Sequence, residues 1–447
     1  MMFRKLFCGA LATGTTTLIS AAALAQDTVG AAPAVANPGN NAWMMTATVL
    51  VLMMILPGLA LFYGGLTRSK NMLSMMTQIG ATAALAMLIW VMWGYSLAFG
   101  PTAIDGFMGQ FFSTGSYFLS SVTPDSTAPT FSEEVISEYV FVSFQMTFAA
   151  ITAALILGAT AERMKFSATM VFVTIWLTIV YFPIAHMVWA GGGLLFEMGA
   201  LDFAGGTVVH INAGVSGLVL AYLLGKRKGF PEEKMPPHSM TLTMVGTGLL
   251  WVGWFGFNAG SELEADGVAG LAMINTFVAT AAGALTWMFV ERIAGHKPSS
   301  LGFASGIIAG LVAVTPAAGN SGPLGAISLG IAASVVAYFA VAKLKPALGY
   351  DDSLDAFGIH GVGGIVGAIG TGIVYSPALG GPGDPADYVM GAQVWIQIKA
   401  VLVAIAWAGV GTLIAGLITR ALVGLRVSPE SEVAGLDISE HEERAYN

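Results

Sequence analysis

Residues 206–225 read Gly-Thr-Val-Val-His-Ile-Asn-Ala-Gly-Val-Ser-Gly-Leu-Val-Leu-Ala-Tyr-Leu-Leu-Gly, without an acidic residue, a lysine or an arginine. About 20 predominantly apolar residues cross the hydrocarbon core of a bilayer as a helix. The stretch therefore predicts a membrane-spanning helix with one histidine, His210, in its first third. A second glycine-rich stretch, 356–376, contains His360 in a similar setting.

The rest of the chain has the same apolar character. Of the 447 residues, 55% are hydrophobic and only 10% are charged, whereas soluble domains carry about 25% charged residues. Besides 206–225, ten stretches are long and apolar enough to span a membrane: 43–64, 75–99, 136–160, 166–188, 239–259, 267–290, 300–318, 324–343, 356–376 and 396–424. We therefore predict an all-α polytopic membrane protein with eleven transmembrane helices. The eighth span, 300–318, has glycines at four-residue spacing, so we expect it to be buried among the others.

Positive charges predict the orientation of these spans. The loops after odd-numbered spans and the final tail carry lysine and arginine. The loops after even-numbered spans carry none, even the long one from Pro101 to Glu138, and Lys399 at the start of the last span is the single exception. Because cytoplasmic loops are enriched in these residues, the N-terminus should lie outside and the C-terminus in the cytoplasm.

The N-terminus is typical of a secretory signal peptide. Arg4 and Lys5 precede an apolar stretch that ends in Ala23-Leu24-Ala25, a small-residue cleavage site. Cleavage of residues 1–25 would remove Cys8, the only cysteine, and with it any disulfide or thiol chemistry. An uncleaved first helix is the alternative interpretation. We expect a cell inner membrane protein with a periplasmic segment over 26–42, a membrane domain over 43–425 and a cytoplasmic tail over 426–447.

His210 and His360 indicate an internal repeat. Each histidine lies in a glycine-rich span that takes the fifth place in a block of five spans. Because five is odd, the second block enters from the opposite side of the membrane, which predicts two inverted five-helix repeats plus a final helix. In such transporters the substrate path lies between the repeats. The other four histidines (His186, His238, His296 and His441) lie in loops or near span ends and carry no such signal.

Two histidines at equivalent positions within a membrane suggest a functional pair. Ionisable groups at membrane depth are costly and usually face an interior path, although a single buried histidine often just bonds a neighbouring carbonyl group. Two imidazoles in contact can share a proton and still meet a substrate at their free edges. Such a pair suits a small nitrogen base better than a metal ion, which would need carboxylates or a third nitrogen ligand. We expect no metal, no cofactor, no nucleic-acid partner and no enzymatic activity, because nucleophile, zinc and phosphate-loop motifs are missing.

Asp202 lies just before the fifth span, where an aspartate can cap the exposed amides of a helix start. A second candidate role for Asp202 is to attract a cation through its negative charge. Trp189, Phe148 and Phe257 lie near outer span ends or within spans. Aromatic faces attract cations by about 0.5–2 kcal/mol, but most of the 10 Trp and 25 Phe residues must serve packing.

Longer motifs carry a family resemblance. They are Gln145-Met146-Thr147-Phe148, Ala161-Glu162-Arg163, His186-Met187-Val188-Trp189, Asp202-Phe203-Ala204-Gly205-Gly206, His210-Ile211-Asn212, Trp254-Phe255-Gly256-Phe257-Asn258-Ala259-Gly260-Ser261 and Phe357-Gly358-Ile359-His360-Gly361. From about residue 43 to Asn447 the chain resembles the ammonium transporter (Amt/Mep/Rh) family, and its bacterial Amt branch in particular.

The resemblance implies a homotrimer in which each protomer has a narrow pore for ammonium or ammonia. It implies that Trp189, Ser261 and Phe148 recruit ammonium, that Phe148 and Phe257 form an aromatic gate, and that His210 and His360 line the pore. Asp202 would be a buried aspartate important for transport. It also implies that the tail couples subunits and that PII-type signal proteins dock on the cytoplasmic face. The resemblance assigns no role to Glu262, directly after Ser261.

The expected mechanism is recruitment of ammonium outside, loss of its proton and passage of ammonia beside the histidines. The proton either follows through the imidazole pair, which makes transport electrogenic, or returns outside, which makes the protein a gas channel. An ammonium sensor is an alternative function, disfavoured by the short tail, and a membrane-embedded enzyme is a weaker one. Methylammonium should be a substrate, and potassium should not.

Overall fold

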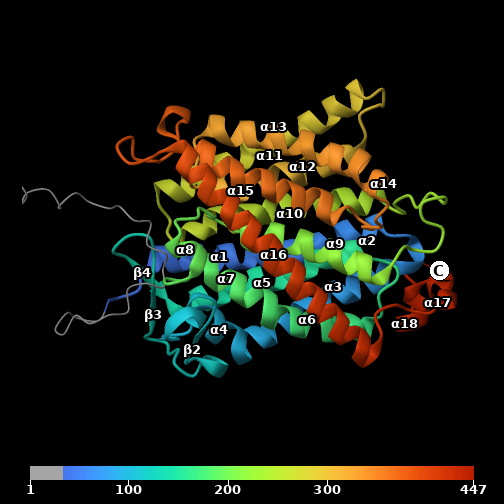
Figure 1. Cartoon of the computed structure of the whole chain (residues 1–447), viewed down its shortest axis with the longest axis horizontal. Coiled ribbons are helices and arrows are strands. Elements are labelled where there is room, and N and C mark those ends of the chain that lie inside the picture. The colour runs from blue at the N-terminus through green and yellow to red at the C-terminus, as the bar shows by residue number, and fades with distance from the viewer. Residues whose placement is uncertain (1–33, 447) are drawn as a thin grey trace, which may run out of the picture.

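The computed structural model describes residues 34–446, which form one bundle of long helices (Figure 1). Between these residues, 11 helical stretches are long and apolar enough to cross a membrane. The predicted number of spans is therefore confirmed. The predicted signal peptide, 1–25, lies outside the described residues.

The first six spans are built from these helices, with π-helical or 3-10 turns labelled η: α1 Pro38–Met53, η1 Met54–Leu59 and α2 Ala60–Leu66; η2 Ser69–Asn71, α3 Met72–Ile89, η3 Trp90–Gly94 and α4 Tyr95–Phe99; α5 Glu138–Thr160; α6 Phe166–Trp176, η6 Leu177–Tyr181, α7 Phe182–Trp189 and α8 Leu194–Glu197; η7 Gly206–Ile211 and α9 Asn212–Leu224; α10 Met240–Ala259 and η8 Gly260–Glu262.

The last five spans and the tail follow in the same order: α11 Gly267–Ile293; α12 Ser300–Val314 and η9 Thr315–Ala317; α13 Pro323–Phe339, η10 Ala340–Leu344 and α14 Lys345–Leu348; η11 Phe357–Gly361 and α15 Val362–Val374; α16 Met390–Val423; and in the tail α17 Pro429–Ala434 and α18 Leu436–His441. Short 3-10 turns η4 Gly106–Gln110, η5 Tyr117–Leu119 and η12 Pro377–Leu379 lie in loops.

The first span starts at Pro38, five residues before the predicted boundary at residue 43. The side chain of Asn37 accepts hydrogen bonds from the backbone N–H groups of Gly39 and Asn40 and so caps the helix. Proline is well suited to the first helical turn because its missing N–H would have no partner there. Hydropathy alone misses this start, because the capping residues are polar.

The long loop between spans two and three forms two small hairpins. Strand β1 (Thr102–Ala103) pairs with β2 (Ser113–Thr114), and β3 (Thr127–Pro129) pairs with β4 (Val135–Ser137), both antiparallel. Beneath the loop, the two ring nitrogens of His186 lie 2.8 and 2.9 Å from the carbonyl oxygens of Ala98 and Gly109. His186, which carried no signal in the sequence, therefore ties the loop to α4.

The two histidine-bearing spans cross at their glycines. Gly214 on α9 packs against the backbone of Gly361, and Gly364 on α15 packs against Gly206 and His210. Gly214 and Gly364 each lie four residues after their histidine, so the crossing uses the same position in both spans. Small residues at this position allow the backbones to approach closely.

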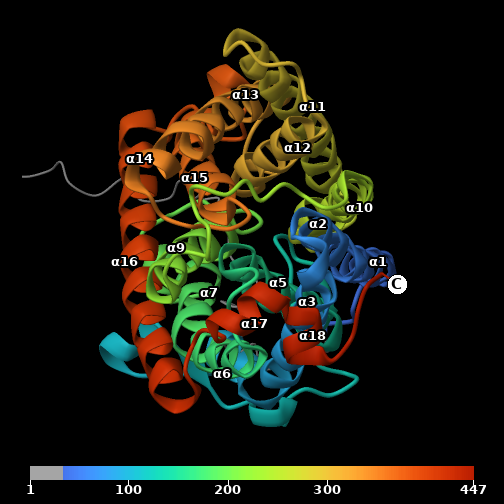
Figure 2. The same cartoon turned by 90° about the vertical axis from the view of Figure 1, so that its right-hand side faces the viewer.

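The eighth span is the buried one, as predicted. Every residue of α12 from Ala304 to Val314 is buried. Gly306 and Gly310 lie against the backbone of α11 at Gly283 and Ala279. By contrast α16, which lies along the edge of the bundle (Figure 2), exposes large apolar side chains such as Leu402, Val410 and Leu422. A surface of this kind requires lipid or a neighbouring subunit.

The tail is folded onto the bundle rather than free. Helices α17 and α18 lie across the ends of α3 and α6 (Figure 2), and the backbone N–H of Leu436 donates to the side chain of Asn71. We call this end of the bundle the tail face. The short α8 lies at the opposite end (Figure 1).

Replacing Gly214 with alanine should weaken the central crossing. The added methyl group would collide with the backbone of Gly361, and backbone cannot rotate away as a side chain can. We expect a loss of about 1–3 kcal/mol in stability, measured as a lower temperature at which the detergent-solubilised protein aggregates. Gly248→Ala is the matched control, because a methyl group there meets no atom within 4 Å. Equal heat stability of the two variants would contradict a tight crossing.

Candidate functional site

An unbroken row of rings leads into the bundle. Phe148 meets Trp189 edge-on at 5.7 Å and stacks on Phe257 at 4.3 Å between centroids. Phe257 in turn lies 6.0 Å from the ring of His210, and His210 lies 5.3 Å from His360. These five predicted site residues come from five different spans. The structure therefore brings them together, although the sequence separates Phe148 and His360 by more than 200 residues.

The row begins at a cavity of about 120 Å³, which we call the Trp189 cavity. Its lining includes Trp189, Phe148, Ser261, Glu262 and Asp202. The indole N–H of Trp189 donates to the backbone oxygen of Asp202 at 2.9 Å, which fixes the ring. The Ser261 hydroxyl donates to the carbonyl oxygen of Phe257 at 2.8 Å, so the hydroxyl oxygen keeps its own acceptor capacity.

The stacked phenylalanines separate this cavity from the interior. Phe148 lines the Trp189 cavity, and Phe257 lines a smaller cavity beyond it. Their ring planes are only 24° apart at 4.3 Å, and both side chains are fully buried. Stacked rings at this distance leave no space between them for a molecule to pass.

The smaller cavity, which we call the histidine cavity, has a volume of about 10 Å³, enough for one water-sized molecule. Its lining is apolar apart from His210, His360 and the indole of Trp254, with Met54, Leu59, Phe62, Ile151, Leu155, Val209, Leu250, Phe257 and Ile308 making up the rest.

The rings of His210 and His360 face each other through their Nδ1 atoms. Their Nδ1 atoms are 3.3 Å apart and the rings are nearly parallel, at 22°. A hydrogen bond between two Nδ1 atoms requires one to carry a proton and the other to be bare. Among the described residues the Nε2 atom of His210 has no hydrogen-bond partner, although it is buried. The pair can thus hold one shared proton and present an open ring nitrogen within an apolar chamber.

Trp254 positions His210, a role that the sequence did not reveal. Its indole stacks on the His210 ring at 5.4 Å and 25°. Its own N–H donates to the hydroxyl of Thr315 at 3.0 Å, which holds the indole in place. Trp254 lies within a motif that carries the family resemblance, but only the folded chain shows what it touches.

Asp202 caps the helix that carries His210. Its carboxylate accepts hydrogen bonds from four consecutive backbone N–H groups, those of Gly205, Gly206, Thr207 and Val208. Burial raises the pKa of Asp202 to about 6, and the four N–H donors oppose that rise. The four donors therefore favour the ionised form of the side chain against the effect of burial. The predicted capping role is confirmed. The carboxylate of Asp202 is hydrogen-bonded to the backbone rather than free to contact a molecule in the Trp189 cavity.

Asp352 is the counterpart in the second repeat, and the sequence reading missed it. Its carboxylate accepts from the backbone N–H groups of Ala356 at 3.0 Å and Phe357 at 2.8 Å, at the start of the helix that carries His360. Burial raises its pKa as well. Asp202 precedes His210 by eight residues, and Asp352 precedes His360 by the same number. This spacing is the signal that could have identified Asp352.

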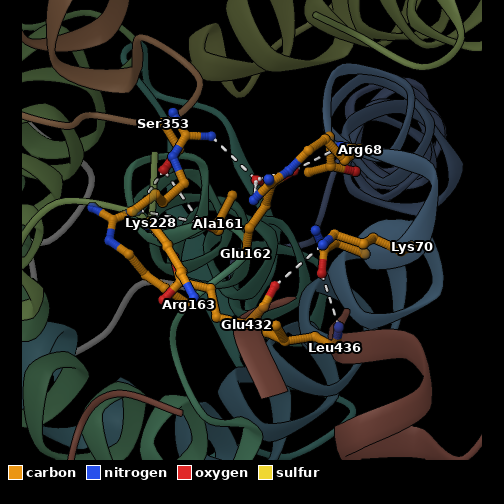
Figure 3. Close-up of polar contacts among 12 residues, drawn as sticks. Arg68, Lys70, Ala161, Glu162, Arg163, Lys228, Ser353, Glu432 and Leu436 are labelled. Carbon is orange, nitrogen blue, oxygen red and sulfur yellow. Dashed lines mark hydrogen bonds and ion pairs between the residues drawn. The ribbon is translucent and has the colours of Figure 1, made fainter. Parts of the chain in front are cut away.

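A network of buried charges holds the tail face together (Figure 3). The carboxylate of Glu162 accepts from the backbone and side chain of Arg68 and pairs with Arg227. Arg227 also forms an ion pair with Asp351, directly before Asp352. The fully buried Arg163 donates to backbone oxygens of Ala161, Gly225 and Asp351 and to the Ser353 hydroxyl. The network therefore joins spans one, three and five to the start of span ten.

The tail is bonded beside this network. The Glu432 carboxylate accepts from the backbone N–H of Lys228 and pairs with Arg426. Lys70 donates to the backbone oxygens of Glu432 and Val433, as Figure 3 shows for Glu432. Next to it opens a third cavity of about 430 Å³, lined by Arg227, Lys345, Asp355 and Ile359 among others. Phe62 lines both this cavity and the histidine cavity, so the two lie on either side of its ring.

The described residues contain no group of three or more His, Cys, Asp or Glu side chains that could hold a metal ion. The candidate site therefore consists of the stacked aromatic rings, the two histidines and the two capping aspartates.

Comparisons with known proteins agree with this geometry. Residues 42–446 match the model described as Ammonium Transporter Family. The chain is similar to the "Ammonium transporter" of Aquifex aeolicus, with 50% identity over 416 residues that cover 92% of this chain and 94% of the relative. It is similar to the "Ammonium transporter" of Bacillus subtilis, with 44% identity over 91% of this chain and 98% of the relative. These relatives are named as transporters and not as enzymes.

Solved structures give the same result. Candida albicans Mep2 superimposes with a TM-score of 0.80 and 36% identity, over 89% of this chain and 88% of that one. A structure titled "Sensor Amt Protein" superimposes with a TM-score of 0.81 and 27% identity, over 90% of this chain and 98% of that one.

Removing the Asp202 carboxylate should destabilise the protein strongly. In Asp202→Ala four backbone N–H groups lose their acceptor, and each buried, unsatisfied group costs about 1–3 kcal/mol. Asp266→Ala, which removes a helix cap with a single bond to the N–H of Ala269, should cost about 1 kcal/mol. The measurement is heat-induced aggregation of the solubilised protein. A smaller loss in Asp202→Ala than in Asp266→Ala would refute the capping role.

The stability that the ion network contributes should decrease at acidic pH. Burial alone would raise the pKa of Glu162, but Arg227 and Arg68 hold it below its usual value. A carboxyl whose pKa is lowered by folding stabilises the protein above its unfolded pKa, about 4, and loses that effect as the pH falls through the folded value. Glu162→Gln should therefore be about 3–5 kcal/mol less stable than the wild type at pH 5–7.

The difference in heat stability between wild type and Glu162→Gln should shrink below about pH 4. Glu133→Gln serves as the control, because Glu133 is exposed and far along the chain from this network. A difference that is independent of pH down to that range would argue against an ionic contribution.

Proposed function

This chain belongs to the ammonium transporter family, and on that premise we propose that it carries ammonium across the membrane as ammonia, with the proton removed at the site described above. The observation that supports this proposal best is the histidine pair in an apolar chamber closed by stacked rings. A cation cannot rest in such a chamber without losing its hydration, whereas a neutral molecule of the size of water fits.

The first step is recruitment in the Trp189 cavity. The faces of Trp189 and Phe148 attract a cation, and the Ser261 oxygen accepts one of its N–H groups. Asp202 fixes the start of the fifth span and the backbone oxygen that holds Trp189. It acts on recruitment through position, since its carboxylate is bonded to backbone.

The second step is deprotonation and passage. A low-dielectric environment disfavours the charged form of a base, so ammonium is deprotonated as it leaves the cavity. The Nε2 atom of His210, which has no hydrogen-bond partner among the described residues, is the acceptor through which the proton enters the histidine pair. Ring movement of Phe148 and Phe257 then admits ammonia to the histidine cavity. Potassium has no proton to lose and is rejected by the cost of dehydration alone, which gives selectivity without a cage of carbonyl oxygens.

The proton follows through the histidine pair. The shared Nδ1 contact allows a proton that arrives on one imidazole to leave from the other. Transport is then electrogenic, and the net carried species is ammonium. The alternative is a gas channel, in which the proton returns to the side from which it came.

Orientation and assembly belong to the same proposal. In this proposal the tail face lies in the cytoplasm and the Trp189 cavity outside, in a cell inner membrane, and the positively charged loops support this orientation. The exposed apolar side chains of the outer helices then meet lipid and the two other subunits of a homotrimer. The docked tail and the neighbouring cavity offer a PII-type signal protein a regulatory site on the cytoplasmic face.

Removal of one histidine tests the relay directly. In proteoliposomes given an ammonium pulse, the wild type should produce a transient current that a potassium pulse does not produce. His210→Ala should abolish that current or its selectivity, because the shared proton has no second imidazole. His296→Ala, at an exposed loop histidine, should behave like the wild type.

Two other outcomes would change the conclusion. Faster internal alkalinisation than in empty liposomes, without a current, would establish a gas channel instead of the relay. If monodisperse, folded protein gave neither signal, transport itself would be refuted, and sensing of ammonium would become the leading function.

A further inference from the structure

Glu262 is a buried carboxylate at the wall of the Trp189 cavity. It lies in the 3-10 turn η8, directly after Ser261, and only 6% of its surface is exposed. Within residues 34–446, no hydrogen bond or ion pair reaches its side-chain oxygens from another residue, yet the residue lines the cavity together with Trp189 and Phe148.

The neighbouring acids are occupied elsewhere. Glu264 accepts a hydrogen bond from the backbone N–H of Ser132 at 2.9 Å and so holds the outer loop. Asp266 caps α11 through the N–H of Ala269 at 2.9 Å. Of these three neighbouring acids, Glu262 alone has no hydrogen-bond or ion-pair partner among the described residues, which leaves its side-chain oxygens available to a ligand.

The cavity offers a complementary set of acceptors. The hydroxyl of Ser261 donates a hydrogen bond to the carbonyl oxygen of Phe257, so its oxygen can still accept one. The side-chain oxygen of Gln145, which also lines the cavity, is buried without a partner in the described chain. An uncompensated buried carboxylate is costly. A small cation with N–H groups would supply the counter-charge that lets Glu262 ionise, and it could donate to the oxygens of Glu262 and Ser261.

We propose that Glu262 is an anionic ligand of the recruited cation and sets the affinity of the Trp189 cavity for it. This inference rests on the proposed function and extends it, since Trp189, Phe148 and Ser261 carry no charge and the Asp202 carboxylate is bonded to backbone N–H groups. It has a second consequence. A bare carboxylate attracts any monovalent cation, so potassium should compete for the cavity although it is not carried further.

Glu262→Gln tests the charge while keeping the shape of the side chain. In uptake of labelled methylammonium by proteoliposomes, we expect KM to rise at least about fivefold and the maximal rate to change less than about twofold, because only binding loses a contribution. Competition by potassium should weaken in parallel. Glu262→Asp should recover most of the affinity. Glu133→Gln removes an exposed acid from the outer loop and should leave KM unchanged.

The outcomes separate this inference from the function beneath it. If the wild type transports and Glu262→Gln, verified as monodisperse and equally heat-stable, keeps its KM, Glu262 is not a ligand. A lower maximal rate at unchanged KM contradicts the proposal equally. If the wild type does not transport, the proposed function fails, and the ligand role is judged by heat stabilisation with ammonium chloride. That stabilisation must then be present in the wild type and lost in Glu262→Gln.

Discussion

The carboxylate of Asp202 accepts hydrogen bonds from four backbone N–H groups at the start of a helix that begins inside the protein. The geometry of the site depends on that interaction. Within a bilayer no water is present to satisfy such groups, so an internal helix start needs a built-in acceptor. Asp352 provides the same solution for the other half. Each aspartate fixes the first turn of its helix, and each histidine follows eight residues later.

The glycine crossing turns these two helices into one site. Gly214 and Gly364 permit backbone contact between the repeats, and that approach brings the Nδ1 atoms of His210 and His360 to 3.3 Å. A side chain at Gly214 would collide with the backbone of Gly361 and push the two helices apart. Packing by small residues is therefore part of the chemistry, because it sets the distance between the histidines.

The two ends of the bundle use acidic residues in opposite ways. At the tail face, Glu162 and Asp351 are neutralised by arginines and join several spans to the start of span ten. At the other end, Glu262 has no such partner among the described residues. Paired buried charges hold structure in place, whereas an unpaired one at a cavity wall is available to a cation.

The sequence by itself determined the number of spans, because hydrocarbon thickness sets a length that any apolar run must meet. It also indicated the repeat, the two histidines and the capping role of Asp202. Family motifs supplied Trp189, Ser261, Phe148 and Phe257, which composition could not distinguish from other aromatic or polar residues.

The tertiary structure decided which of these residues touch. Asp352, the stacking of Trp254 on His210, the bonds of His186 and the docked tail all depend on contacts between segments far apart in the chain. Hydropathy measures only how each segment partitions between water and lipid. The contacts that pair two histidines and leave Glu262 without a partner arise from packing between helices. The residue pattern of one segment does not specify which other segment packs against it.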